Sequence, residues 1–577
     1  MKFARLAEYF ARLEGTTKRR TMCDLLSALF QEADLEEIEP LVYLCQEQLL
    51  PPYRGLELGL AEKLITTAIA RAAAQEEKGV IAQYKRLGDL GLVAEVLVQR
   101  TDDRSALDVV TVYDKLLTIA RTSGEGSIEQ KIQLLADLLR RLSPPEVRYV
   151  VRFAMGQLRL GIGDPTILDA LSVAAVKDKS LRPELERAYN LCSDLGLVAR
   201  TLFAAGKNGI KGFTVQVGRP IRMALAERVA TASEIVQRLG KCRVERKYDG
   251  LRLQCHKRGN QVEMFSRNLK RMTLMFPELI AAIRRQVQAK EVILEGEAVA
   301  VNEETGELFP FQVTVQRKRK HAIEEHAKEF PLVLFAFDLL YADGSDYTCR
   351  PYLQRQTKLA ALITAGERIR LAEGIITDEA TRIEQFFDES IEKGLEGIVA
   401  KRLDAIYQAG ARNFNWIKLK RSYRGELSDT VDVVIVGYLR GRGLRARFGI
   451  GALLGAVYDE ASDTFKTVAK IGSGLTEEEW VKARRLCDQV SMTHRPARVD
   501  SLIEPDVWVE PKYVFTVLAD EITKSPIHTC GKRGAEPGYA LRFPRLIGWV
   551  RADKRPEDAT TVQEIHTLYR LQRRVKV

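Results

Sequence analysis

Lys247 lies in the segment Lys247-Tyr248-Asp249-Gly250, between a predicted strand and a predicted hairpin. A lysine amine is a nucleophile only when it is neutral, so a reactive lysine needs nearby cations or partial burial to lower its pKa from about 10.4. Taken alone, the K-x-D-G pattern is weak, because about one chain in ten of this length should contain it by chance. The alternative is an exposed lysine beside a tight turn.

Further segments rich in charged and aromatic residues follow Lys247 in a fixed order, and their chance co-occurrence is negligible. In the segment Trp416–Lys420, Lys418 and Lys420 are two residues apart and share one face of a predicted strand. These two cations could supply the positive field that a neutral lysine requires. The segments are Ser266–Asn268, Glu295–Glu297, Phe337–Asp338, Glu396–Lys401 and Trp416–Lys420.

Several other kinds of site are not indicated. No G-x-x-x-x-G-K-[ST] pattern occurs, so a bound nucleotide would not be held by a P-loop. The six histidines and eight cysteines form no zinc-ligand spacing, and the cysteines are scattered singly, as in a reduced intracellular protein. Any metal should therefore be a hard cation that carboxylates hold.

The composition is that of a globular protein of several domains. Its 577 residues are 46% hydrophobic and 29% charged, which excludes a single small module and a disordered chain. The formal net charge of +11 favours a polyanionic partner, although a solubilising surface accounts for about half of such cases. No signal-peptide pattern or long apolar run is found, so we expect a soluble, cytoplasmic protein, nucleoid-associated if it is prokaryotic.

The first 212 residues predict an all-helical domain, because Leu and Ala recur at helical spacing. Ser143 and Glu146 form a capping box, from which we expect a helix that runs toward Gly161. On that helix Arg148, Arg152 and Arg159 would share one face, and an apolar stripe would occupy another. A following helix should begin at Asp164-Pro165.

Residues 213–422 change to short alternating segments, which predict an α+β domain rich in antiparallel strands. Leu251 to Phe265 is a hairpin candidate, and Pro331–Leu340 is apolar enough for a strand buried on both faces. Residues 423–577 predict a small β-rich domain, a barrel or a sandwich. Its expected strands are Val431–Tyr438, Gly451–Tyr458, Phe465–Ile471 and Trp508–Leu518.

With these motifs the sequence resembles the covalent nucleotidyltransferase superfamily, and closely the ATP-dependent DNA ligases of archaeal and eukaryotic replicative type. Almost the whole chain takes part in the resemblance. Gly218–Ala226 is similar to the entry to the adenylation domain, and Leu541–Arg545 with Arg551, Asp553 and Lys554 is similar to the last ligase motif. The resemblance implies three domains: a helical DNA-binding domain, an α+β adenylation (nucleotidyltransferase, ATP-grasp-like) domain and an OB-fold β-barrel.

The resemblance also implies the role of each site residue. Lys247 would form a phosphoramidate with AMP, pass the AMP to the 5′-phosphate of a nick, and leave the 3′-hydroxyl to displace it. Glu245 would recognise adenine, Phe337 would stack on the base, and Arg252 and Glu297 would reach the ribose. Arg267, Arg412 and Lys418 would face the phosphates. Core packing for Phe337 and a solvated loop for Arg412 remain alternatives at about one in four.

A divalent ion should offset charge in each displacement at phosphorus, and Glu297 and Glu396 are the candidate ligands for Mg²⁺ or Mn²⁺, with ATP as cosubstrate. For Glu396 a surface or salt-bridged glutamate is the alternative, at about one in five. The sequence leaves ADP, GTP and NAD⁺ open as replacements for ATP, since nucleotide choice depends on hydrogen bonds in the pocket. The role of the arginine-rich loop Arg440–Arg447 also stays open.

The expected partner is nicked double-stranded DNA, bound through its phosphates by Arg148, Arg152 and Arg159 and by the basic carboxyl terminus. Ordinary surface arginines are the alternative, at about one in three. We expect a monomer without a membrane partner, and a sliding clamp is a candidate recruiter. The expected roles are replication, recombination and repair, and with them the cell cycle and cell division.

Other activities fit the sequence less well. RNA ligases and mRNA capping guanylyltransferases leave the first 210 residues unexplained, and NAD-dependent ligases carry a four-cysteine zinc module that this sequence lacks. A catalytically idle DNA-binding scaffold is the alternative from another class. The intact Lys247, Glu297, Glu396 and Lys418 argue against it, because burial of a lysine among cations has no structural benefit.

Overall fold

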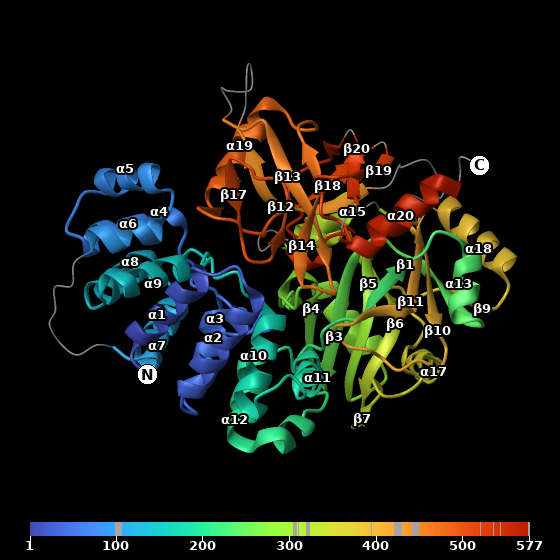
Figure 1. The fold of residues 1–577 in the computed structure, drawn as a ribbon. Helices are drawn as coiled ribbons and strands as arrows, with labels where there is room; N and C mark the ends of the chain where they lie inside the picture. The colour runs from blue at the N-terminus through green and yellow to red at the C-terminus, as the bar shows by residue number, and fades with distance from the viewer. Residues whose placement is uncertain are drawn as a thin grey trace.

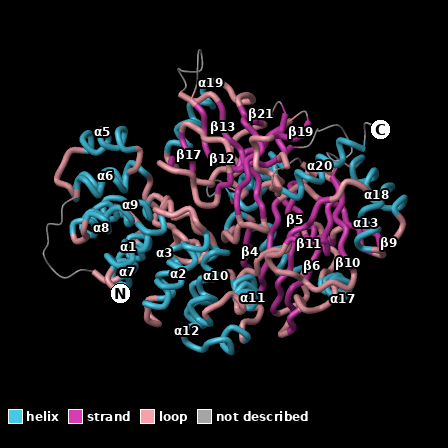
Figure 2. Tube along the Cα trace, in the orientation of Figure 1, coloured by secondary structure: helices cyan, strands magenta, loops and turns pink. Residues whose placement is uncertain are grey.

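The computed structural model describes residues 1–574, except 99–106, 304–307, 310, 319–322, 394, 421–429, 441–448, 520, 535 and 543. Three regions follow one another along the chain (Figure 1): a helical region of residues 1–212, a central region of residues 213–420 and a C-terminal region of residues 430–574. Coloured by secondary structure, the first is made of helices, and the other two mix strands with helices (Figure 2). No helix in the described ranges is long and apolar enough to cross a bilayer.

The helical region forms around one continuous core of Leu, Ile, Val and aromatic side chains. Asp89, Asp108 and Asp194 cap helices with their carboxylates, which accept hydrogen bonds from first-turn amides. The helices are α1 (Phe3–Glu14), α2 (Arg19–Glu32), α3 (Ile38–Cys45), α4 (Glu62–Ala72), α5 (Glu77–Leu87), α6 (Leu90–Leu97), α7 (Val109–Arg121), α8 (Ser127–Arg140), α9 (Pro144–Ala154), α10 (Asp164–Val176), α11 (Arg182–Cys192) and α12 (Leu195–Lys211).

The helix that starts at the Ser143 capping box is shorter than the sequence predicts. The box itself is confirmed, and so is the start of α10 at Asp164. However, α9 ends at Ala154, and Gly156 then adopts a left-handed backbone with φ +64°, which ends the helix. Arg159 therefore lies outside the helix, in the connection to α10, and cannot share a helical face with Arg148 and Arg152.

The central region contains two sheets that face each other. In the described part of the chain, the first sheet has the strand order β1-β11-β10-β2-β9, and the second has β4-β3-β5-β6-β7 with β8 beside β6. Helices α13 and α18 cover the outer face of the first sheet, and α14 and α17 cover that of the second. The predicted hairpin and the predicted buried strand are confirmed as β3–β4 and β6.

The elements of the central region are β1 (Leu225–Arg228), α13 (Ala232–Leu239), β2 (Cys242–Lys247), β3 (Leu251–Arg258), β4 (Gln261–Ser266), α14 (Pro277–Gln286), β5 (Glu291–Ala300), α15 (Phe311–Thr314), α16 (Ile323–Glu329), β6 (Leu332–Ala342), β7 (Ser345–Asp346), α17 (Tyr352–Leu362), β8 (Ile369–Leu371), β9 (Gly374–Thr377), α18 (Ala380–Glu392), β10 (Gly397–Arg402) and β11 (Arg412–Lys420). Strand β1 runs parallel to β11, whereas β2, β9, β10 and β11 pair antiparallel.

The C-terminal region is rich in strands, as the sequence predicts. One sheet of described strands has the order β15-β17-β12-β13-β14-β16, with β18 also beside β12, and the predicted strand Trp508–Leu518 is divided into β17 and β18. The elements are β12 (Thr430–Leu439), β13 (Ala452–Asp459), β14 (Thr464–Ile471), α19 (Glu477–Asp488), β15 (Ser491–Met492), β16 (Val499–Asp500), β17 (Val507–Val509), β18 (Val514–Leu518), β19 (Glu521–Ser525), β20 (Gly538–Arg542), β21 (Arg545–Leu546) and α20 (Val562–Arg574).

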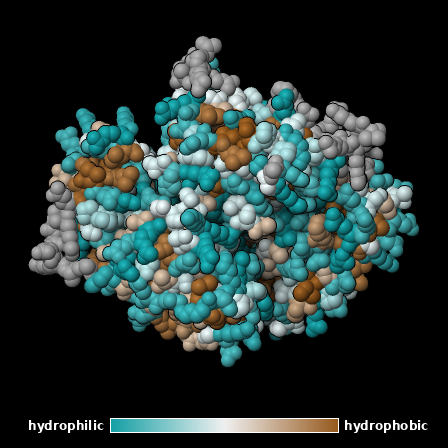
Figure 3. Space-filling model, viewed as in Figure 1, coloured by the Kyte–Doolittle hydropathy of each residue, from teal (hydrophilic) through white to brown (hydrophobic). Residues whose placement is uncertain are grey.

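The three regions contact each other pairwise. Asp164 of the helical region pairs with Arg222 of the central region at 3.1 Å, and Arg267 of the central region pairs with Asp558 of the C-terminal region at 3.3 Å. Lys512 of the C-terminal region donates to the carbonyl of Gly156 at 3.0 Å, so the C-terminal and helical regions are in contact as well. The face viewed in Figure 3 is largely hydrophilic, with smaller apolar patches.

Candidate functional site

A cavity of about 650 Å³ lies between the two sheets of the central region and opens against the C-terminal region. Strands from both sheets supply its walls, and residues 551–564 of the C-terminal region cover one side. Every nucleotide-site and metal-site residue predicted from the sequence lines it. These residues are Glu245, Lys247, Arg252, Arg267, Glu297, Phe337, Glu396, Arg412 and Lys418.

Strand register brings Lys247 to Glu396. Gly397 of β10 lies opposite Lys247 of β2 on one side and opposite Lys420 of β11 on the other. Glu396 immediately precedes Gly397, so its two carboxylate oxygens contact the Nζ atoms of Lys247 and Lys420. Gly397 has φ +149°, and a Cβ atom there would meet the carbonyl of Leu419 at 2.1 Å, so this close approach requires glycine.

The charge on Glu396 is fixed by these two lysines. Burial would raise the pKa of Glu396, but the ammonium groups of Lys247 and Lys420 lower it below its usual range. The same ion pair holds the amine of Lys247 against the wall of the cavity.

Glu297 is a second acidic group beside Lys247. It lies on β5 opposite Arg252 of β3. Burial raises the pKa of Glu297 to about 7, against the opposing charges of Lys247 and Arg252. The negative charges of Glu396 and Asp249 act in the same direction as burial. Glu297 is therefore a carboxyl group that changes charge near neutral pH.

Glu297 and Glu396 are two carboxylates of this cavity that could hold a metal ion. In the described residues no group of three His, Cys, Asp or Glu side chains is arranged to hold a metal ion. Mg²⁺, however, commonly uses only one or two protein carboxylates and takes its other ligands from phosphates and water. Glu297 and Glu396 fit that requirement in their chemistry and in lining one cavity.

The inner end of the cavity is an aromatic enclosure around a buried ammonium group. The Nζ atom of Lys401 lies 4.4 Å from the ring centre of Trp416, 4.5 Å from that of Phe337 and 4.8 Å from that of Tyr352. It pairs with Glu245 at 2.7 Å and donates to the carbonyl of Phe337 at 3.1 Å. This lysine fixes both the carboxylate and the backbone that carries the predicted stacking ring.

Arg252 closes the same end of the cavity. Its guanidinium group donates to Glu295 at 2.8 Å and to the carbonyl of Ala224 at 2.7 Å. It lies 5.4 Å from the ring centres of both Phe337 and Trp416. Arg252 is thus fixed in place before any ligand binds.

The cations expected to face phosphates are paired with carboxylates of the C-terminal region. Glu564 of α20 lies 3.2 Å from Arg412 and 3.7 Å from Lys418. Burial lowers the pKa of Lys418 well below its usual value, and the charge of Glu564 opposes that effect. These cations are therefore neutralised from within the protein in the present arrangement.

The last motif of the sequence reaches the same cavity. Arg551 and Asp553 form an ion pair at 2.9 Å, and Lys554 contacts Asp432. The side-chain amide of Asn268 donates to the carbonyl of Asp553 at 3.1 Å. Residues far apart in the chain thus meet at the cavity mouth. Most of the arginine-rich loop, residues 441–447, lies outside the described residues.

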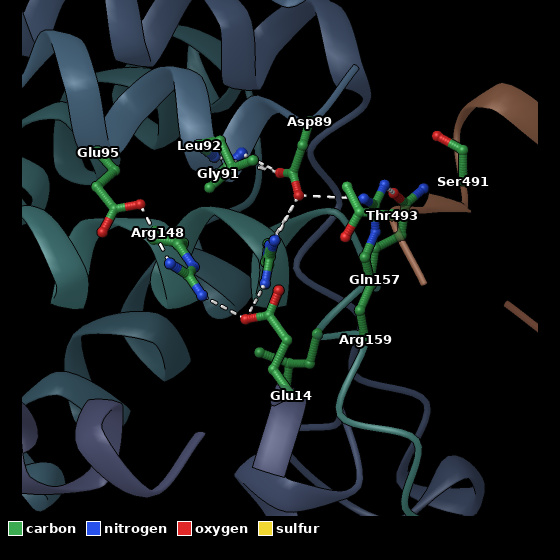
Figure 4. A network of polar contacts seen from close by, with 12 residues as sticks. Glu14, Asp89, Gly91, Leu92, Glu95, Arg148, Gln157, Arg159, Ser491 and Thr493 are labelled. Atoms are coloured by element: carbon green, nitrogen blue, oxygen red, sulfur yellow. Dashed lines mark hydrogen bonds and ion pairs between the residues drawn. The ribbon is translucent and has the colours of Figure 1, made fainter. Parts of the chain in front are cut away.

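The three arginines expected to contact DNA lie away from this cavity, in a network of carboxylates (Figure 4). Asp89 accepts hydrogen bonds from Arg152 at 2.6 Å and from Arg159 at 3.1 Å. Arg148 contacts Glu14 and lies 3.3 Å from Glu95. The predicted shared face is not formed, because Arg159 lies outside α9, and Arg152 and Arg159 are only 3% and 7% exposed. Contact of these arginines with DNA stays a prediction.

Some residues that shape the cavity were not assigned a role from the sequence. Lys401 ends the motif Glu396–Lys401, so its position was visible, but its aromatic surroundings come from three separate elements. Tyr352 donates a hydrogen bond to Glu245 from α17, and no local pattern marks it. Glu564 lies about 150 residues after the cations that it neutralises, and only the fold reveals that contact.

Comparison with known proteins covers the whole chain. Three family models match: "DNA ligase N terminus" over residues 2–172, "ATP dependent DNA ligase domain" over 223–420 and "ATP dependent DNA ligase C terminal region" over 446–554. A protein of Dictyoglomus thermophilum named "Probable DNA ligase" is 54% identical over 100% of this chain and 99% of its own length. A "DNA ligase" of Sulfurisphaera tokodaii is 44% identical over 100% and 98% of the two chains. The chain belongs to the family of ATP-dependent DNA ligases.

Proposed function

We propose that this ligase seals nicks in duplex DNA through a covalent AMP adduct on Lys247. The observation that carries the proposal is the convergence of Lys247, Glu396, Glu297 and the base-end residues on one cavity. Nζ of Lys247 attacks the α-phosphorus of ATP, a nitrogen–phosphorus bond forms, pyrophosphate departs, and the amine loses a proton. The 5′-phosphate of the nick then attacks the same phosphorus and releases Lys247, and the 3′-hydroxyl finally displaces AMP.

Glu245, Phe337 and Arg252 bind the nucleoside in this proposal. Phe337 stacks on adenine, because its ring faces the cavity next to Trp416. Glu245 accepts from the exocyclic amine of adenine, and Arg252 and Glu297 reach the ribose. The ion pair of Glu245 with Lys401 supports this role, since it holds the carboxylate ready at the inner end of the cavity.

Arg267, Arg412 and Lys418 bind the phosphates, and Glu297 with Glu396 would hold Mg²⁺ or Mn²⁺. The metal ion would supply positive charge at the phosphates during each displacement. The chain's own cations act in the same way, because preorganised charges in a partly buried cavity stabilise developing negative charge. Glu564 must leave Arg412 and Lys418 before a triphosphate can pair with them.

The regions correspond to three functional domains in this proposal: a helical DNA-binding domain of residues 1–212, an adenylation domain of 213–422 and an OB-fold of 423–577. The strand order of the C-terminal sheet and its cover by α19 are compatible with a barrel. The partner is nicked duplex DNA in replication, recombination and repair, with a sliding clamp as a candidate recruiter. Contacts of Arg148, Arg152 and Arg159 with DNA would require the network around Asp89 to rearrange.

The experiment is to incubate the protein with α-labelled ATP and Mg²⁺ and then add nicked duplex DNA. Wild type should acquire label and lose it to sealed product, whereas Lys247→Ala should acquire none. Lys290→Ala, which removes an exposed lysine of the same region, is the matched control and should behave as wild type. Label on the Lys247→Ala protein would refute the assignment of the nucleophile, and label that never seals DNA would refute nick sealing.

A further inference from the structure

The helical and C-terminal regions meet at several polar contacts, one of which pairs Arg19 with Asp463 at 3.3 Å. Lys512 donates to the carbonyl of Gly156 at 3.0 Å, and Arg159 donates to the carbonyl of Gln489 at 3.1 Å. Each of these bonds crosses between regions more than 300 residues apart in sequence. With these bonds, each of the three regions contacts both of the others.

Each of the two regions contributes a glutamate to this contact, and the charges of the two glutamates interact. Glu47, which follows α3, accepts a hydrogen bond from the backbone amide of Leu158 at 2.6 Å. Glu510, which follows β17, lines a second cavity, of about 620 Å³, together with Glu47. Among the described residues, Oε2 of Glu510 is buried and has no hydrogen-bond partner. An unpartnered carboxylate oxygen at an interface is costly unless it carries a proton.

The backbone at the contact is strained on the helical side. Glu47 has φ +56° and Arg159 has φ +60°, a left-handed conformation that residues other than glycine rarely adopt. Such conformations persist where surrounding contacts hold them in place. Glu47 is held within the helical region by the amide of Leu158, and the side chain of Arg159 reaches across to the carbonyl of Gln489.

The groups around the two carboxylates do not neutralise both of them. Arg152 and Arg159 face Glu510 but already bind Asp89, and Lys512 is shared between Glu47 and Glu510. Tyr513 is a further titratable group beside Glu510, and Arg498 and Arg555 line the same cavity. Burial and the charge of Glu47 raise the pKa of Glu510 to about 7, against the charges of Lys512, Arg159 and Arg152. Burial also raises the pKa of Glu47.

We propose that Glu47 and Glu510 form a proton-operated latch that holds the helical and C-terminal regions together in the DNA-free protein. In the closed form the pair binds a proton that lies between the two regions. When the contact opens, both carboxylates enter water and release the proton to solvent. The latch acts on the arrangement of the regions and does not depend on the chemistry at Lys247.

The direction of the pH effect follows from this proton. In the open form a hydrated glutamate has its ordinary pKa of about 4.3, whereas the closed pair keeps its proton up to about pH 7. The closed form therefore binds more protons between these limits. The equilibrium constant for opening should rise about ten-fold per pH unit from pH 5 to pH 7 and level off above that.

Small-angle X-ray scattering of the full-length protein without DNA tests the latch. The radius of gyration of wild type should increase between pH 5.5 and 7.5 and change little from 7.5 to 8.5. Glu510→Gln keeps the shape of a protonated carboxyl, so it should stay compact at every pH. Glu478→Gln, which removes an exposed glutamate of the same region, should follow wild type.

Circular dichroism at each pH confirms that the compared samples are folded. A wild-type radius that does not change with pH would overturn the proposal. A Glu510→Gln protein that expands as wild type does would overturn it equally, since the proton would then reside elsewhere. The experiment measures the shape of the protein and not its activity. A failure of the latch can therefore be distinguished from a failure of AMP transfer.

Discussion

Oε1 of Glu564, on the last helix of the chain, lies 3.2 Å from Nη1 of Arg412 on a strand of the central region. Both side chains are less than one-tenth exposed. Burial would raise the pKa of Glu564, but the charges of Arg412 and Lys418 lower it below its usual range. The C-terminal helix thus places a carboxylate where the proposed function needs the phosphates of ATP.

Replacing Glu564 with Gln should speed adenylation of the free enzyme. The substitution removes the internal competitor for Arg412 and Lys418, and a desolvated ion pair of about 1 kcal/mol corresponds to roughly five-fold in rate. Single-turnover labelling with α-labelled ATP measures the effect, with Glu536→Gln, an exposed glutamate of the same region, as the control. A Glu564→Gln rate equal to or below that of wild type would show that the ion pair does not compete with ATP.

Lys401→Met should weaken the use of ATP through KM more than through kcat. The change removes the nearer of the two cations that pair with Glu245 and leaves Arg243 at 3.1 Å, which costs about 2 kcal/mol, or roughly thirty-fold in kcat/KM. Lys401→Arg keeps the charge and should recover part of the loss. Initial rates of adenylation over a range of ATP concentrations separate the two constants. An unchanged KM would remove Lys401 from the positioning of the base.

Adenylation by the free enzyme should depend on the ionisation of Glu297. Burial raises the pKa of Glu297 to about 7, so the group is mostly neutral below that pH and ionised above it. If the carboxylate is the active form, kcat/KM for ATP should rise about ten-fold per pH unit up to about pH 7. The Glu297→Gln variant should have a low kcat/KM for ATP that does not rise with pH in this range. Measuring kcat/KM for ATP from pH 5.5 to 9 with wild type and with Glu297→Gln tests this prediction.

Sequence patterns predict the site well where strand register alone places the residues. Lys247, Glu396 and Lys420 meet because Gly397 lies opposite both lysines in neighbouring strands. The motifs are short, and each is contained in one strand or in the turn beside it. Their order along the chain therefore carries most of the information about the cavity.

Contacts between distant elements could not be predicted in the same way. Helical periodicity placed Arg152 on a polar face, but its partner Asp89 caps another helix 63 residues earlier. The left-handed turn at Gly156 ends α9 early, and a glycine in sequence does not reveal its backbone angle. Glu564 likewise acts through the packing of one region on another, which no local pattern encodes.

The stability of the central region should fall in acid because of His256. Nδ1 of His256 accepts a hydrogen bond from the amide of Gly218 at 2.9 Å, and burial lowers the pKa of the ring to about 3. The unfolded chain binds a proton near pH 6.5, so the stabilisation is full above that pH and is lost toward pH 3. The slope is about 1.4 kcal/mol per pH unit.

Urea unfolding of wild type and His256→Gln at pH 7.5 and 5.5 tests this contribution. Glutamine can still accept the hydrogen bond from the amide of Gly218, but it does not titrate. The two proteins share all other ionisable groups, so the effects of those groups cancel in the comparison. The stability advantage of wild type should shrink by about 1 kcal/mol at the lower pH. An advantage that is the same at both pH values would mean that His256 titrates alike in the folded and unfolded chains.

Arg152→Ala should reduce the stability of the helical region more than its affinity for DNA. The guanidinium group is almost fully buried and pairs with Asp89 at 2.6 Å and with Glu14 at 2.9 Å. Its removal leaves two buried carboxylates with fewer partners, and breaking such a pair costs about 3–5 kcal/mol. Arg86→Ala, at an exposed arginine of α5, is the control and should unfold as wild type does.

Thermal unfolding and nicked-DNA binding at two salt concentrations separate the two roles of Arg152. A structural role predicts earlier unfolding with an unchanged salt dependence of binding at temperatures where the variant is folded. A phosphate contact instead predicts normal unfolding and a salt dependence weaker by about one counter-ion. The second outcome would mean that the network around Asp89 opens when DNA binds and frees its arginines for the duplex.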